Sequence, residues 1–299
     1  MPGVAAEWWA AAGAPATVVA QDLVWHDEVR DRAVPVRVYR PAVSKAAVPV
    51  VIFSHGLGGS RYVYAHIGRH LAAHGYLSVH VQHAGSDGAL FGDGSVAVAF
   101  LRAVSDPQQR IDRRIDLRFA IDRVLAGAVP DVRVDPQALA LAGHSFGAWA
   151  ALDAVGQGGA EIDERVAAVV ALSPIGPGPW GLTAHSWDQL RGPVLFMTGD
   201  EDTTLGTADW RSRLVPFERG AARPAWCAIT QRMRHHAFGD YHFPGRTIRR
   251  DPRHHAWILA VMTAFLDANL REDPAAQAWL GSSAASDLSA GEMTLQYKP

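Results

Sequence analysis

The 299-residue chain contains a single cysteine, Cys227, so it cannot form an internal disulfide and is compatible with a reducing compartment. It also lacks a charge imbalance, because it has 28 lysines and arginines and 30 aspartates and glutamates, which gives a formal net charge of −2. The two signs are interspersed along the chain, unlike the basic patches that bind nucleic acids or membrane surfaces. No apolar run approaches the roughly 20 residues of a membrane span. The sequence therefore predicts neither a nucleic-acid partner nor a membrane span.

Residues 1–20 lack the basic start of a secretory signal, since they contain Glu7 but no lysine or arginine. We expect a cytoplasmic protein in which these residues form an N-terminal extension. The phosphate-loop motif G-x-x-x-x-G-K-[ST] is missing as well. Although the chain has 14 histidines, it has no H-E-x-x-H or comparable ligand spacing. We therefore expect no cofactor and no metal site.

Apolar, β-branched segments alternate with segments of helical periodicity along most of the chain. The predicted strands lie at 22–40 (an antiparallel pair), 49–53, 76–81, 138–142, 165–172, 193–198 and 222–230, and the predicted helices at 62–74, 106–127, 146–155 and 254–270. This alternation predicts an α/β fold, with a mostly parallel sheet, an antiparallel edge at the N-terminus and helices on both faces. No linker divides residues 21–280, which we expect to form one domain. The small, polar residues 281–299 predict a loosely held tail.

The segment LALAGHSFGAWAAL, residues 139–152, places Ser145 between Gly143 and Gly147, where a predicted strand meets a predicted helix. The glycines remove side chains that would collide with the strand and the helix, so the turn can hold the serine in a strained conformation. The N-terminus of the following helix directs its N–H groups and its positive dipole end toward an oxyanion formed on the serine. This G-x-S-x-G pattern predicts that Ser145 is a catalytic nucleophile.

A glycine-rich loop, HGLGG at 55–59, follows the predicted strand at 49–53. In folds with a G-x-S-x-G turn, one oxyanion donor comes from a loop of this kind and the other from the residue after the nucleophile. We therefore predict that the backbone N–H groups of Leu57 and Phe146 form an oxyanion hole.

The acid and the base should follow the serine along the chain, with the histidine last. The predicted strand at 193–198 leads into the acidic stretch GDED, where the spacing G-x-x-D from Gly199 favours Asp202 as the acid, with Asp200 as the alternative. The preceding strand ends in ALSPIG, which offers Ser173 and no carboxylate at the other usual position. This absence favours Asp202 further.

The base is expected in the loop QRMRHHAFGDYHFPG, which contains three histidines. The pattern H-x-x-F-x-D, from His235 through Phe238 to Asp240, favours His235 as the base. His236 is the alternative, because the weak strand before the loop leaves the register open. We predict that the triad is Ser145, Asp202 and His235.

With these motifs in place, the chain resembles the α/β-hydrolase superfamily, and within it the platelet-activating factor acetylhydrolase-like and "predicted dienelactone hydrolase" branch. The segments that carry the resemblance are VVIFSHGLGGSR (51–61), LAAHGYLSVHVQHAGSD (71–87), GHSFGAWAAL (143–152), GDED (199–202) and HHAFGDY (235–241). The resemblance implies an α/β-hydrolase fold and a serine esterase without a cofactor. Two features depart from it. Acetylhydrolases of this type carry the acid where Ser173 stands, and dienelactone hydrolases use a cysteine nucleophile, whereas Cys227 lies far from the serine turn.

These observations predict a serine hydrolase that cleaves carboxylic esters through an acyl-enzyme intermediate. The expected partner is a small-molecule ester of short to medium acyl length, or a polyester-like substrate. One alternative is the same fold performing other chemistry, such as C–C bond hydrolysis. A second alternative is a non-catalytic hydrolase-like binding module, although such modules usually lose one of the three residue types.

Overall fold

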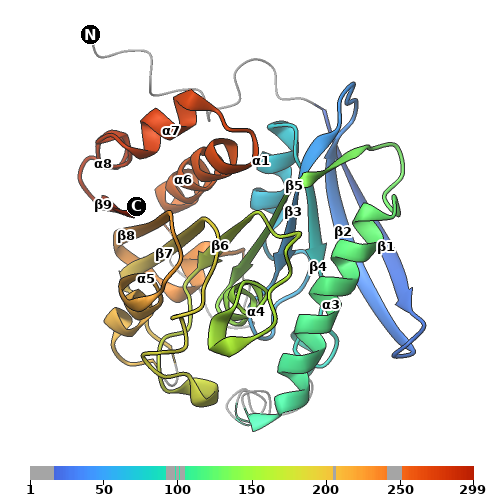
Figure 1. Cartoon of the computed structure of the whole chain (residues 1–299), viewed down its shortest axis with the longest axis horizontal. Coiled ribbons are helices and arrows are strands. Elements are labelled where there is room, and N and C mark those ends of the chain that lie inside the picture. The colour runs from blue at the N-terminus through green and yellow to red at the C-terminus, as the bar shows by residue number, and fades with distance from the viewer. Residues whose placement is uncertain (1–16, 92–97, 99–100, 102–104, 205–206, 241–250) are drawn as a thin grey trace.

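A nine-stranded sheet forms the centre of the molecule (Figure 1). The computed structural model describes residues 17–91, 98, 101, 105–204, 207–240 and 251–299. The strands, in chain order, are β1 (Val18–Asp27), β2 (Arg32–Pro41), β3 (Val48–Ser54), β4 (Leu77–Val81), β5 (Val134–His144), β6 (Ala168–Leu172), β7 (Val194–Glu201), β8 (Ala225–Arg234) and β9 (Met293–Lys298). Across the sheet they follow the order β1-β2-β4-β3-β5-β6-β7-β8-β9.

Strands β3 to β8 pair in parallel, and the sheet ends in antiparallel pairs on both sides. Ser54 at the end of β3 pairs with Gly143 at the end of β5, and Gly143 pairs with Ala171 of β6. The loops that leave the carboxyl ends of these strands therefore start side by side. Ligand sites of open α/β sheets lie at this edge.

Helices cover both faces of the sheet (Figure 1). The helices of the described chain are α1 (Ala65–Ala73), α3 (Pro107–Leu125), α4 (Phe146–Asp153), α5 (Val215–Arg219), α6 (Pro252–Leu270), α7 (Pro274–Leu280) and α8 (Ala284–Leu288). Every residue of β3 is buried, and its side chains alternate between two cores. Val50 and Ile52 pack in the core shared with α3 and α4, whereas Val51 and Phe53 pack in the core shared with α1 and α6. A strand buried on both faces explains the continuous apolar run in the sequence.

Three helices begin with the same dipeptide, aspartate followed by proline. The side chains of Asp106, Asp251 and Asp273 accept hydrogen bonds from backbone N–H groups in the first turns of α3, α6 and α7. Proline is favoured at the first helical position because its missing N–H would have had no partner there. This local chemistry places the start of α3 where the sequence predicts it.

The predicted α/β architecture is confirmed, with an antiparallel N-terminal edge and helices on both faces. The expected N-terminal extension falls largely outside the described residues, and β1 already begins at Val18. Among the described residues, no helix combines the length and the apolar character needed to cross a membrane.

The C-terminal residues 281–299 differ from the predicted loose tail. They form α8 and β9, and β9 pairs antiparallel with β8 from Met293 opposite Thr230 to Lys298 opposite Ala225. Met293 is fully buried, and the Lys298 ammonium donates to the carbonyl oxygen of Gly220 at 2.7 Å. The small, polar composition concealed this strand, because its stability comes from closing the edge of β8 and not from local hydrophobicity.

Candidate active site

Ser145 lies in a sharp turn between β5 and α4. Its φ of 55° and ψ of −113° are unusual for a residue with a side chain, and such backbone strain costs about 1–3 kcal/mol. The turn is held on both sides, because the Ser145 N–H donates to Leu172 O at 2.9 Å and its carbonyl accepts from Trp149 N at 3.0 Å. The surrounding hydrogen bonds thus hold a strained serine at the carboxyl edge of the sheet.

The glycines on either side of Ser145 are required by close backbone contacts. A Cβ atom on Gly143 would lie 2.3 Å from the carbonyl group of Gly147. A Cβ atom on Gly147 would lie 1.9 Å from the carbonyl oxygen of Ser54, at the end of β3. The first residues of α4 therefore pack directly against the end of β3, and any side chain at these two positions would push the turn away.

Asp202 and His235 meet beside this turn. His235 Nδ1 lies 2.8 Å from Asp202 Oδ1, and both side chains are buried. Asp202 follows β7, and His235 begins the short helix η5 (His235–Phe238) after β8, so neighbouring parallel strands deliver both groups to one edge. The imidazole of His144, the residue before Ser145, lies 4.5 Å from that of His235 between ring centroids. Asp202 and His235 are thus paired, and His144, the neighbour of Ser145 in the chain, contacts the imidazole of His235.

The Asp202 carboxylate contacts two further side chains. Thr198 Oγ1 donates to Asp202 Oδ2 at 2.9 Å, and Arg213 Nε lies 3.1 Å from Oδ1. Arg213, from the short helix η4 (Trp210–Leu214), also donates to the Asp202 carbonyl at 2.8 Å. Burial opposes ionisation of Asp202, but Arg213 and His235 beside it hold the pKa of the carboxyl well below its usual range. The acid therefore remains ionised across the physiological pH range.

Ser173 contacts the same histidine. Its Oγ lies 2.8 Å from His235 Nδ1, and its backbone has a φ of 53° at the end of β6. This is the position at which the resembling acetylhydrolases carry their acid, so both possible acid positions face one imidazole. Here the carboxylate comes from β7, and the end of β6 provides a hydroxyl.

The alternative acid and base lie differently. The Asp200 carboxylate accepts the backbone N–H of Arg232 at 2.5 Å and so joins the end of β7 to β8. The ring of His236 stands at 76° to that of His235, with 5.5 Å between the centroids. Of the two candidate acids, Asp202 is the one with a described hydrogen bond to His235.

Burial lowers the pKa of His235 below its ordinary value of 6.5, although the carboxylate of Asp202 acts in the opposite direction. The imidazole is therefore neutral at pH 7 and can accept a proton. Cys227 is unsuited to nucleophilic attack, because it is buried in β8 and burial raises the pKa of its thiol to about 12.

The two predicted oxyanion donors lie on either side of the serine turn. Phe146 begins α4, and N–H groups in the first turn of a helix have no partner within the helix. Leu57 lies between Gly56, whose N–H donates to Tyr64 Oη at 3.4 Å, and Gly58, whose N–H donates to Ser86 O at 2.9 Å. These neighbouring bonds hold the loop on both sides of Leu57.

A buried arginine under the predicted oxyanion loop, residues 55–59, was not predicted from the sequence. Arg113 of α3 is fully buried, and its NH1 donates to the carbonyl oxygen of His55 at 2.5 Å. Its Nε donates to Ser86 Oγ at 2.8 Å, and its guanidinium carbon lies 4.2 Å from the ring centroid of Phe146. Arg113 therefore contacts both segments that carry the predicted oxyanion donors. The helical pattern that placed α3 gives no signal for such a contact.

Beside Arg113 lies a second alignment of aspartate, histidine and serine. His83 Nδ1 is 3.0 Å from Asp116 Oδ2, and His83 Nε2 is 2.9 Å from Ser54 Oγ. All three residues are buried, and Arg30 and Arg32 bind the Asp116 carboxylate. Because a substrate cannot reach Ser54, this network serves to support the loop that begins at His55.

Aromatic rings surround the serine turn on the side of α4. The ring of Trp180 lies 4.6 Å from that of Phe146 and 5.6 Å from that of Trp149. Trp149 is buried, whereas Trp180 is partly exposed. Trp180 thus offers an apolar surface next to Phe146.

Two cavities of the described chain lie away from this turn. One of about 630 Å³ is lined by residues such as Val48, Gly75 and Ala138, at the amino ends of the strands, and a second lies beside Gly192. Neither cavity is lined by Ser145 or His235. The paired, buried side chains of Asp202 and His235 are stronger evidence of a site than the size of a cavity.

Comparison with known proteins shows what this chain is similar to. The family model for platelet-activating factor acetylhydrolase, isoform II, matches residues 14–91, which include the HGLGG loop but not Ser145, Asp202 or His235. Platelet-activating factor acetylhydrolase of Cavia porcellus is 24% identical over 247 residues, which cover 70% of this chain and 52% of that protein. The chain thus spans about half the length of that relative.

Ferulic acid esterase from Streptomyces cinnamoneus has a similar solved structure, with a TM-score of 0.71 and 21% identity. The match covers 95% of this chain and 98% of the other. A likeness over nearly the whole chain confirms the predicted α/β-hydrolase fold. The names of both relatives denote ester hydrolases.

Proposed function

We propose that this chain, an α/β-hydrolase-fold protein resembling platelet-activating factor acetylhydrolases, is a serine hydrolase that cleaves carboxylic esters through an acyl-enzyme intermediate. The observation that carries the proposal is the strained φ of 55° at Ser145, at the sheet edge where His235 and Asp202 are joined at 2.8 Å. Strain of this kind is retained where the surrounding structure enforces it, and it is common at nucleophiles.

In the proposed mechanism the Ser145 hydroxyl attacks the ester carbonyl carbon while His235 accepts its proton. The resulting imidazolium donates that proton to the leaving alcohol as the C–O bond breaks, which leaves an acyl group on Ser145. Water then attacks the acyl carbon, again with His235 as the base, and the carboxylic acid is released. Asp202 keeps the imidazole oriented and stabilises its positive charge through the bond to Nδ1.

The N–H groups of Leu57 and Phe146 would hold the negative oxygen of each tetrahedral intermediate. One such donor contributes about 3–4 kcal/mol of transition-state stabilisation in comparable enzymes. The positive end of α4 adds to this effect, because its N-terminus begins at the residue after the nucleophile.

The proposed substrates are esters of short to medium acyl length or polyester-like chains. The partly exposed ring of Trp180, packed on Phe146 beside the serine turn, supports an apolar group on the substrate. The relatives, an acetylhydrolase and a ferulic acid esterase, support ester cleavage without determining the acyl group.

The test is incubation with a fluorophosphonate, followed by intact mass measurement and peptide mapping, with Ser145→Ala alongside. We expect one adduct on Ser145 in the wild type, none in the variant, and turnover of a p-nitrophenyl ester series by the wild type only. Ser54 is the internal control, because it belongs to an aspartate–histidine–serine alignment but is fully buried. A folded wild type that reacts with neither the fluorophosphonate nor any ester would refute the proposal.

A further inference from the structure

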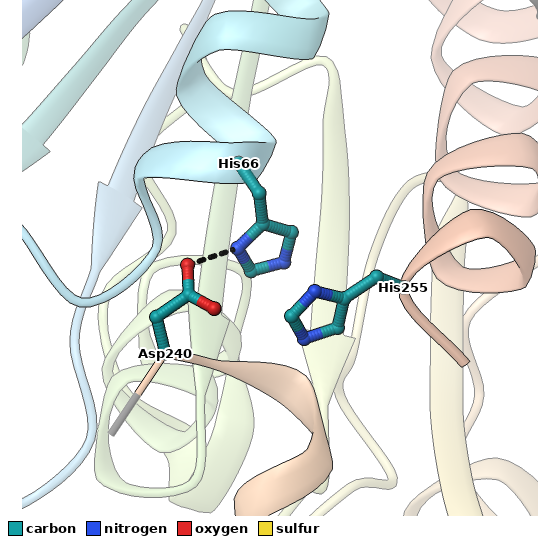
Figure 2. A group of neighbouring side chains, drawn as sticks. All are labelled: His66, Asp240 and His255. Carbon is teal, nitrogen blue, oxygen red and sulfur yellow. Dashed lines mark hydrogen bonds and ion pairs between the residues drawn. The ribbon is translucent and has the colours of Figure 1, made fainter. Parts of the chain in front are cut away.

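Two histidines and an aspartate from three distant segments meet outside the proposed active site (Figure 2). His66 lies in the first turn of α1, Asp240 follows η5, and His255 lies in the first turn of α6. One possible ligand atom from each residue lies within 4.8 Å of the other two. Figure 2 shows the imidazole of His66 between the carboxylate of Asp240 and the ring of His255.

The contacts within this group are specific. His66 Nδ1 lies 3.1 Å from Asp240 Oδ2. The rings of His66 and His255 are stacked, with 3.9 Å between their centroids and 2° between their planes. The stack therefore places two possible nitrogen ligands beside the carboxylate of Asp240.

The second ring nitrogen of His66 is buried, and no hydrogen bond reaches it from the described part of the chain. A buried polar atom of this kind is costly unless an ion or water satisfies it. Figure 2 shows this nitrogen on the side of the His66 ring that is nearer to His255. The side chain thus has a carboxylate at one nitrogen and an available lone pair at the other.

We propose that His66, Asp240 and His255 form a binding site for one divalent transition-metal ion of the zinc type, with water as a further ligand. Two histidines and a carboxylate are a common set for zinc, whereas calcium and magnesium prefer oxygen ligands only. Ligands around tetrahedral zinc lie about 3.4 Å apart, given metal–ligand distances of about 2.0–2.2 Å. Side-chain rotations that shorten the present spacing and turn the two rings out of their parallel stack would therefore close the set.

The bound ion would join three elements that carry or support the proposed active site. Asp240 lies in the same short segment as His235, and its N–H already donates to Val63 O, just before α1, at 2.7 Å. An ion at this position would fasten that segment to α1 and α6. Its role is structural, because Ser145 and Asp202 contribute nothing to the group.

The experiment is calorimetric titration of the chelator-treated full chain with zinc ions, together with thermal melts with and without zinc. We expect one tightly bound zinc per chain and a higher Tm with zinc. His66→Ala and His255→Ala should each weaken binding at least ten-fold and abolish the rise in Tm. His66→Gln and His255→Gln provide the same test with side chains of similar bulk.

His185→Ala is the matched control. His185 and Asp188 form an exposed pair at 3.0 Å, the same chemistry as His66 and Asp240 without a second histidine. This variant should bind zinc as the wild type does. Equal zinc affinity in the wild type and the His66 and His255 variants would overturn the proposal, as would the absence of binding at micromolar zinc.

Discussion

At the scale of single residues, two neighbouring strand ends each place one side chain beside His235. One of these side chains is a carboxylate and the other is a hydroxyl. Asp202 follows β7, and Ser173 at the end of β6 contacts the same Nδ1 atom at 2.8 Å. Aspartate tolerates the positive φ that Ser173 adopts better than most residues do. The fold therefore offers two places from which an acid can serve one histidine.

This arrangement predicts a rescue. Asp202→Asn should lower kcat for a short p-nitrophenyl ester by about 10²–10⁴, because the imidazole loses its orienting charge. Adding Ser173→Asp should recover at least ten-fold of that loss, since the new carboxylate would lie beside the same nitrogen. Circular dichroism checks that both variants fold. If kcat does not recover in a folded double variant, a carboxylate at position 173 cannot replace Asp202 beside His235.

The protonation of His235 predicts the acid side of the pH profile. Burial lowers its pKa below 6.5, and the neutral imidazole is the active form. Activity should therefore persist as pH falls to 6.5 and decline only below it, as the imidazole takes up a proton. Measuring kcat/KM against pH tests this, and a midpoint above 6.5 would rule out the neutral, buried base described here.

At the scale of elements, α3 supports the oxyanion loop and α4 together through one side chain. Arg113 bonds the carbonyl of His55 and lies over Phe146, while the alignment of Ser54, His83 and Asp116 completes the support. We regard Arg113 as a positioning residue, because its contacts are to the loop that begins at His55 and to the ring of Phe146.

Arg113→Met should reduce kcat about 10²-fold with little change in KM, since losing geometry at an oxyanion hole affects the transition state more than ground-state binding. It should also lower the free energy of unfolding by about 1–3 kcal/mol, because buried carbonyl groups lose their donor. Arg113→Lys should restore part of kcat. Arg114→Met is the control, because that partly exposed side chain, also on α3, binds the buried Asp153 at the other end of α4. Equal effects on kcat in the two methionine variants would argue against a positioning role.

At the scale of the whole molecule, the C-terminal strand closes one edge of the sheet. β9 covers β8, and the buried Met293 packs in the core shared with α6. Without β9, the row of backbone N–H and C=O groups along β8 would be open to other chains.

Deleting residues 291–299 should therefore lower the free energy of unfolding by about 3 kcal/mol or more, and favour aggregation, because a buried methionine and a strand pairing are lost together. Thermal melts and light scattering measure both effects. Lys298→Ala, which removes the bonds to the carbonyls of Phe217 and Gly220 and the contact with the Phe217 ring but keeps the strand, should cost about 1 kcal/mol. A truncated chain with the same Tm as the full-length protein would show that the strand is dispensable.

The sequence by itself determined the features that depend on residues close together in the chain. The glycine spacing around Ser145, the aspartate–proline starts of helices and the apolar runs of the strands are local, so they predicted the elements and the serine turn. The order of acid and base along the chain favoured Asp202 and His235, yet left Asp200 and His236 open.

Only the tertiary structure decided which distant segments meet. Periodicity shows that a side chain faces inward, but it does not show what that side chain will contact, because the packing of the whole sheet determines the partner. Arg113 meets His55 across 58 positions, and His66 meets Asp240 across 174. The support of the oxyanion loop and the proposed metal site therefore exist only in the folded chain.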